Sequence, residues 1–124
     1  MLEKGNNVVQ DKSYKFALRI IKLYQFLYNK KKEFVLSKQV LRSGTAVGAL
    51  IEEGIHAESK SDFIHKINIA YKEAKETYYW IRLLRDSGII DKKSSDSILN
   101  DCEELNKLLT QILITSRKNL KSTK

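Results

Sequence analysis

Two short motifs in this chain place a histidine three residues after an acidic residue, Glu53-x-x-His56 and Asp62-x-x-His65. In a di-iron helical bundle, two Glu-x-x-His motifs and a glutamate from each of two further helices bind the metal ions. A carboxylate and an imidazole on one helix face are suitable ligands for iron or manganese. These two motifs are therefore the first candidates for a chemical activity.

The order of these residues along the chain argues against a metal centre. Both motifs flank a single expected turn between two helices. The carboxylates that could complete the site, Glu73 and Glu76, lie on the same helix as His65, roughly two to three turns further along. No second pair of facing helices supplies the missing ligands. We therefore expect surface or interface histidines, with no metal and no cofactor.

Other catalytic signals are equally weak. The one cysteine, Cys102, lies on an apolar helical stripe, which favours a buried structural thiol over a nucleophile. Gly44, Gly48 and Gly54 fall within a predicted helix, so they do not form a phosphate-binding turn between a strand and a helix. We expect no enzymatic activity, and no small-molecule substrate is evident.

The tract from Leu41 to Gly54, LRSGTAVGALIEEG, holds three of the chain's five glycines. Each glycine costs a helix roughly 1 kcal/mol relative to alanine, so three of them indicate that another backbone packs very close. Arg42 and Glu53 flank the small residues, and a charge at a tight contact is normally paired. We expect Arg42 to pair with Glu73 or Glu76 of the next helix and to fix the register of helices or subunits.

Basic residues outnumber acidic ones by 23 to 15, which gives a formal net charge of +8. This excess favours anionic partners, above all nucleic acid, although a solvated basic surface would have the same composition. Lys15, Arg19 and Lys22 share one helix face, and we expect them, with Lys66, to contact phosphates. No RNP, zinc-finger or helix-turn-helix signature indicates sequence-specific binding.

The 124 residues contain no proline, and their apolar residues recur at intervals of three and four. The expected helices run from Asp11 or Ser13 to the lysines at 30–32, from Ser37 to Ile55, from Ser59 to Ser87, and from Asp91–Ser95 to about Ser116. Short connections predict an all-α, left-handed, antiparallel up-down-up-down four-helix bundle over residues 11–118. We expect a disordered polar arm at 1–10 and a basic tail at 119–124.

Two helices carry more apolar residues than one inner stripe needs. The main apolar stripe of the first helix is Ala17, Ile20, Ile21, Tyr24, Leu27 and Tyr28. The same helix has a second stripe, formed by Phe16, Leu23 and Phe26. The third helix has two apolar residues outside its inner stripe, Trp80 and Leu83. A broad core-facing helix would explain them, but we favour an interface between copies of the chain. Gly44, Gly48, Gly54, Arg42, Glu53 and Trp80 are the residues that we assign to packing or to that interface.

No apolar run approaches the length of a membrane span, and the N-terminal residues have no secretory character. A lone cysteine is typical of a reducing compartment. We therefore expect a cytoplasmic protein.

The segments LSKQVLRSGTAVGALIEEG and SKSDFIHKINIAYKEAKETYYWIRLLRDSGII resemble the four-helix-bundle proteins encoded in intervening sequences of bacterial 23S ribosomal RNA genes. The similarity runs from about Leu36 to Ile90. It implies an antiparallel four-helix bundle that assembles as a homopentamer with a central channel. It also implies a relation to the bundle accessory protein of diversity-generating retroelements, which works with a reverse transcriptase and nucleic acid.

Together these features predict a non-enzymatic, basic homo-oligomer, a pentamer, that binds RNA or DNA backbone without sequence specificity. The alternative is a structural or protein-interaction module whose basic surface meets an acidic protein partner.

Overall fold

The structure is a computed structural model, and it describes residues 4–122. Four helices account for most of them: α1 (Lys4–Asn29), α2 (Leu36–Ile55), α3 (Lys60–Asp86) and α4 (Lys92–Ser122). The described residues form no strand. The prediction of an all-α four-helix bundle is confirmed.

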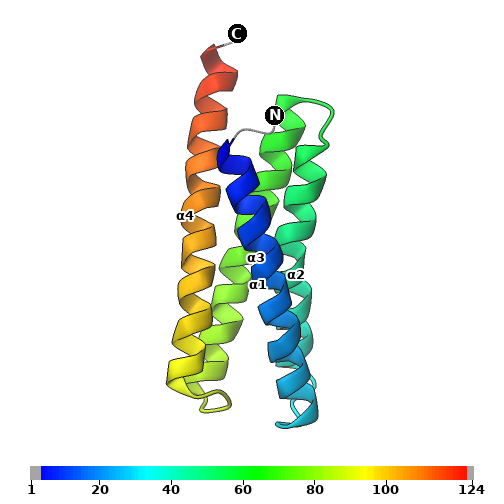
Figure 1. The fold of residues 1–124 in the computed structure, drawn as a ribbon, viewed down its shortest axis with the longest axis vertical. Helices are drawn as coiled ribbons and strands as arrows, with labels where there is room; N and C mark the ends of the chain where they lie inside the picture. Colours follow the sequence, from blue (N-terminus) through cyan, green and yellow to red (C-terminus); the bar gives the residue numbers. More distant parts are fainter. Residues whose placement is uncertain (1–3, 123–124) are drawn as a thin grey trace.

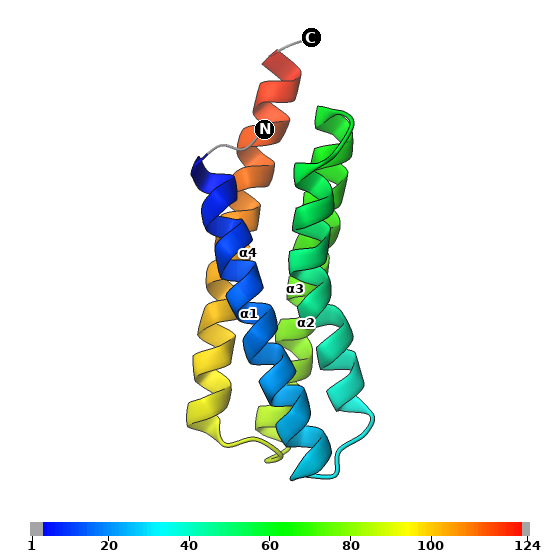
Figure 2. The same cartoon turned by 45° about the vertical axis from the view of Figure 1, so that its right-hand side comes forward.

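The helices stand side by side and alternate in direction. In Figure 1 the chain descends along α1, ascends along α2, descends along α3 and ascends along α4. Each helix packs against its neighbours in sequence, and α1 closes the ring against α4, so that α1 and α3 lie on a diagonal. The connections at 30–35 and 87–91 lie at one end of the bundle, which we call the connection end (Figures 1 and 2).

The core is built from one inward stripe on each helix. Its fully buried large side chains are Val9, Phe16, Ile20, Leu27, Val40, Val47, Ile51, Ile67, Ile81, Leu84, Leu105 and Leu109. The expected main stripe of the first helix was wrong in part, because Phe16 and Leu23 are buried whereas Ile21 and Tyr28 are exposed. Apolar residues make up half of α1, so the sequence alone does not determine which of them face α2 and α4.

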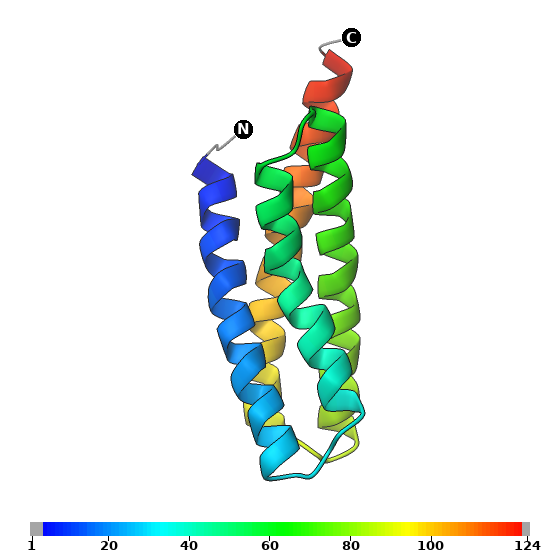
Figure 3. The same ribbon diagram turned by 90° about the vertical axis from the view of Figure 1, so that its right-hand side faces the viewer.

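The expectations for the two ends of the chain were also wrong. Helix α1 begins at Lys4, so residues 4–10 are helical instead of a disordered arm. Val9 is only 1% exposed and packs this polar segment against the core. This packing stabilises a helix that the local sequence does not predict. Helix α4 continues to Ser122, beyond its expected end, and extends past the other helices (Figure 3). Residues 1–3 and 123–124 lie outside the described part.

Three of the predicted helix boundaries have the expected capping or terminating residue. The Ser59 hydroxyl accepts a hydrogen bond from the Asp62 N–H at 3.0 Å, the Asp91 carboxylate accepts one from Ser94 at 2.9 Å, and Gly88 follows α3 with a φ of +80°. Ser37 does not cap α2, because α2 begins one residue earlier, at Leu36.

Glu33 takes the role expected of Ser37. Its carboxylate accepts hydrogen bonds from the backbone N–H groups of Val35, Leu36 and Ser37, at 3.3, 3.1 and 2.7 Å. Partial burial would raise the pKa of this carboxyl, but the three backbone donors outweigh burial and lower it. None of the helices described is long and apolar enough to cross a membrane.

Candidate nucleic-acid interface

The basic residues predicted on α1 do not form an open cationic face. The Arg19 guanidinium is 2.6 Å from the Asp101 carboxylate of α4, and the Lys15 ammonium is 3.0 Å from Asp11 one turn earlier. Lys22 is exposed and forms no salt bridge within the described part of the chain. Of these three residues, only Lys22 is left to meet an outside anion without first breaking a pair.

Lys66 lies on α3, diagonally across the bundle from α1, so it does not join the three residues on that helix. Its ammonium is 3.0 Å from the carboxylate of Glu53. The hydrogen bond and charge of Glu53 raise the pKa of Lys66. The two residues therefore tie α2 to α3, a structural role that the sequence analysis did not assign to Lys66.

Unpaired cations gather instead at the connection end. Lys30, Lys31, Lys32 and Lys38 are exposed around the first connection, and Arg82 and Lys93 are exposed beside the second. None of these six takes part in a salt bridge within the described residues. The lysine run was visible in the sequence as a small basic cluster that ends the first helix, but the phosphate contacts were expected at other residues.

The acidic residues of the connection end are already occupied. Glu33 and Asp91 each accept backbone N–H groups at the start of a helix. Asp86 is 2.9 Å from Arg85, and Asp96 binds both Arg85 and Lys92, at 3.1 and 2.6 Å. The basic residues of this end still outnumber these carboxylates, so it keeps a surplus of positive charge.

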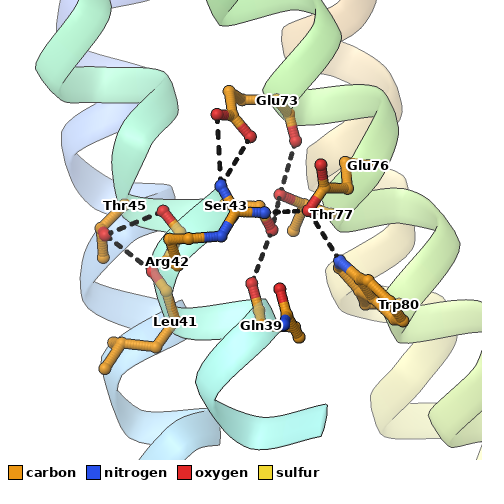
Figure 4. Close-up of polar contacts among 9 residues, drawn as sticks. All are labelled: Gln39, Leu41, Arg42, Ser43, Thr45, Glu73, Glu76, Thr77 and Trp80. Atoms are coloured by element: carbon orange, nitrogen blue, oxygen red, sulfur yellow. Dashed lines mark hydrogen bonds and ion pairs between the residues drawn. The ribbon is translucent and has the colours of Figure 1, made fainter.

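The ion pair predicted for Arg42 is confirmed, and it involves both candidate partners (Figure 4). One guanidinium nitrogen lies 3.2 and 3.3 Å from the two carboxylate oxygens of Glu73, and the other contacts Glu76. The Trp80 indole N–H donates to the same Glu76 carboxylate at 3.0 Å. This arrangement places one cation between two like charges about one turn apart on α3 and fixes the orientation of the half-buried indole.

A buried polar contact lies directly behind Arg42 (Figure 4). The hydroxyls of Ser43 and Thr77 are 2.8 Å apart, and both side chains are fully buried. Each hydroxyl also approaches a carbonyl four residues earlier in its own helix, that of Gln39 at 3.0 Å and that of Glu73 at 2.8 Å. Small polar side chains thus let α2 and α3 approach closely while their buried hydroxyls remain satisfied.

The three glycines of the tract differ in how close their neighbours are. A Cβ atom at Gly44 would lie 2.7–2.8 Å from two carbons of Ile20, which is far inside normal contact. The same atom at Gly48 would lie 3.5 Å from Ser13, and at Gly54 its nearest neighbour would be Lys66 at 3.4 Å. Only Gly44 is a position where α1 leaves no room for a side chain.

No metal site or reactive thiol emerges from the geometry. Within the described residues, no three His, Cys, Asp or Glu side chains are grouped so that they could hold a metal ion. Cys102 is buried with its Sγ 3.2 Å from the Ala74 carbonyl. Burial raises the pKa of the Cys102 thiol to about 12, so the thiolate is scarce at neutral pH.

The model of one protein family, described as 23S rRNA-intervening sequence protein, matches residues 5–111. The chain belongs to this family. The match includes all of α2 and α3 and most of α1 and α4. The resemblance inferred from the tract Leu41–Gly54 and the segment that follows it is confirmed.

A crystal structure from Bacteroides thetaiotaomicron, described as a protein of unknown function from the S23 ribosomal protein family, is similar to this family member. The two are 55% identical, with a TM-score of 0.87 over 88% of this chain and 97% of the other. No curated protein matches the chain. The comparisons therefore establish the fold and the family, and neither description points to catalysis.

Proposed function

We propose that this family member is a non-enzymatic, self-associating bundle that binds the phosphate backbone of RNA or DNA without sequence specificity. The observation that carries the proposal is the asymmetry between its charges. Most acidic side chains in the described part are engaged in salt bridges or helix caps, whereas exposed lysines and arginines remain at the connection end. A surface of unpaired cations binds polyanions by releasing their condensed counterions.

The family description, which names 23S rRNA, supports an RNA partner. Sequence-specific reading is not favoured, because the sequence has no RNP, zinc-finger or helix-turn-helix signature. A cytoplasmic location follows from the same proposal, since ribosomal RNA and most bacterial nucleic acid are found there.

Self-association is supported by exposed apolar side chains on α1. Tyr14, Leu18 and Ile21 are 66%, 46% and 38% exposed, and their spacing places them on one face. Tyr79 and Leu83 form a second exposed pair on α3. Soluble monomers rarely expose such groups, so contact between copies is the simplest way to cover them. We propose a homopentamer, which would carry a formal charge of about +40 and bind a polyanion far more tightly than one chain.

Binding of labelled structured RNA and duplex DNA at several salt concentrations, with light scattering on the same samples, tests the proposal. We expect an oligomer whose log affinity falls linearly with log salt, because each displaced counterion adds to the slope. A well-assembled oligomer that binds neither nucleic acid at low salt would overturn the proposal. Salt-insensitive capture of an acidic protein would then favour a protein-interaction module.

A further inference from the structure

The lysines of the connection end stand beside exposed aromatic rings. Phe26, Tyr28 and Phe34 are 43%, 41% and 45% exposed, although large aromatic side chains are usually well buried. Tyr28 and Phe34 make an edge contact with their centroids 4.8 Å apart, and the Lys31 ammonium lies 5.7 Å from the centroid of Phe26. This end of the molecule therefore combines flat apolar surfaces with positive charge.

The rings lie on both sides of the lysine turn. Phe26 and Tyr28 are two residues apart on α1, which places them on opposite flanks of the helix. Lys30, Lys31 and Lys32 follow directly in the first connection, whose backbone lies at the lower end of the bundle in Figure 2. An extended chain bound at this turn would meet ammonium groups and aromatic rings close together.

The turn that carries these lysines is held by backbone hydrogen bonds. The N–H groups of Lys30 and Lys31 donate to the Phe26 carbonyl at 2.9 and 3.2 Å, and the Glu33 N–H donates to Leu27 at 2.9 Å. Lys32 adopts the left-handed conformation, with a φ of +54°, which reverses the chain direction. The surface is thus ordered before any ligand arrives, which lowers the entropic cost of binding.

Exposed rings distinguish between two kinds of nucleic acid. The bases of a duplex are stacked on each other, so a protein meets phosphates and groove edges but no free base face. The bases of a single strand can stack on aromatic side chains, and proteins that bind single strands combine such rings with a cationic track for the backbone. The composition of the connection end matches the second case.

We propose that the connection end binds a single-stranded segment of RNA or DNA, with its bases stacked on Phe26, Tyr28 and Phe34 and its phosphates beside Lys30, Lys31, Lys32 and Lys38. This inference rests on the proposed function and deepens it, because it names the strand form and the surface. It also moves the phosphate contacts away from Lys15, Arg19 and Lys66, which are engaged in ion pairs.

The test measures binding of a labelled 20-nucleotide single-stranded RNA, and of the duplex made from it, to the full chain and to variants. Lys30, Lys31 and Lys32 are changed to alanine together, and the matched control changes the exposed Lys72, Lys75 and Lys107, which have the same total charge. We expect the connection-end variant to lose tenfold or more in affinity for the single strand, and the control to lose several-fold less.

A second pair of variants tests the rings. Phe26→Ala with Phe34→Ala should weaken single-strand binding several-fold at unchanged duplex binding, whereas Ile114→Ala, which truncates a 56% exposed apolar side chain on α4 far from the connection end, should leave both unchanged. Photo-crosslinking of the unaltered protein to a 4-thiouridine-labelled strand should map to residues 23–38. This measurement keeps the test valid where a variant fails to fold.

The outcomes separate the two proposals. If the unaltered chain binds no nucleic acid, the proposed function fails and this inference fails with it. If single strand and duplex bind equally and the ring variants change neither, the proposed function stands and this inference is overturned. A fall in oligomer mass in the ring variants, with unchanged single-strand affinity, would show that the rings contact another copy and would also overturn it.

Discussion

The contacts that α2 makes with α1 and α3 differ in kind from the contact between α1 and α4. Helix α2 meets α1 and α3 through small residues, with Gly44 against Ile20 and Ser43 against Thr77. Helix α1 meets α4 through long charged side chains, in the pairs Lys12–Glu104 and Arg19–Asp101. Beneath these pairs, beside Phe16 and Leu105, a surface pocket of about 170 Å³ remains between the two helices.

The difference shows two ways to join neighbouring helices. Glycine and other small residues let two helix backbones pack closely and exclude water. A small change in side-chain volume there therefore disturbs the whole contact. Long ion pairs bridge a wider gap but remain in solvent: Lys12 and Glu104 are 41% and 53% exposed. Exposed pairs contribute roughly 0.2–1 kcal/mol, so we expect the α1–α4 contact to be the more tolerant of change and the first to open.

The largest effect is expected at Gly44. An alanine there would place its Cβ 2.7 Å from Ile20, which is fully buried and cannot move away freely. Overpacking costs roughly 1–3 kcal/mol, offset by the roughly 1 kcal/mol gained in helix propensity, so Gly44→Ala should lower the free energy of unfolding by up to about 2 kcal/mol. Urea denaturation measures this change.

Gly48→Ala is the matched control on the same helix. Its Cβ would make an ordinary contact of 3.5 Å with Ser13, so the gain in helix propensity should leave stability unchanged or raise it by up to about 1 kcal/mol. Equal destabilisation by both substitutions would mean that the tract as a whole, and not Gly44 alone, sets the distance between α1 and α2.

A smaller effect is expected where α2 meets α3. Thr77→Val removes a buried hydroxyl that lies 2.8 Å from Ser43, and should lower the free energy of unfolding by about 1 kcal/mol. Ser43→Ala with Thr77→Val should cost less than the two single changes added together, because the double variant leaves no hydroxyl without its partner. Strict additivity in this double-mutant cycle would show that the hydroxyls contribute independently.

The sequence predicted the α2 contacts better than the α1–α4 contact, and the reason is physical. Small residues at helical spacing and the flanking Arg42 are local signals, and an arginine beside a tight contact needs a carboxylate on the next helix. The pairs that join α1 to α4 connect residues about 80–90 positions apart, and nothing near Arg19 indicates Asp101. Arg19 was therefore interpreted as free for phosphate.

The start of α1 and the connection end could not be predicted for related reasons. The polar first residues of α1 have weak helical signals of their own, and Val9 orders them through tertiary packing. The lysines at 30–32 were visible, but their importance depends on what lies beside them in space. Only the fold shows that Glu33, Asp86, Asp91 and Asp96 are engaged elsewhere.

Arginine substitutions compare the ion pairs that join α2 to α3 with those that join α1 to α4. Arg42→Met leaves Glu73 and Glu76 adjacent without a cation and should lower the free energy of unfolding by about 1 kcal/mol. Arg19→Met removes one exposed pair beside the pocket and should cost only a few tenths of a kcal/mol. Urea denaturation at low and high salt measures both, and a larger loss at Arg19 would reverse our ranking of the two contacts.

The smallest effect concerns the titration of Lys12 in the α1–α4 contact. Its pKa lies above the ordinary value of 10.5, first because of the hydrogen bond to Glu104 and then because of that carboxylate's charge. A pKa that is higher in the folded chain stabilises the fold below pH 10.5 and ceases to do so as the pH rises through the folded value. The Cε resonance of Lys12 in NMR spectra should therefore titrate above pH 10.5, and Glu104→Gln should return it to the ordinary value. An unchanged titration in that variant would mean that the Lys12–Glu104 pair does not persist in solution, and that α1 and α4 are held together by Arg19 and the core alone.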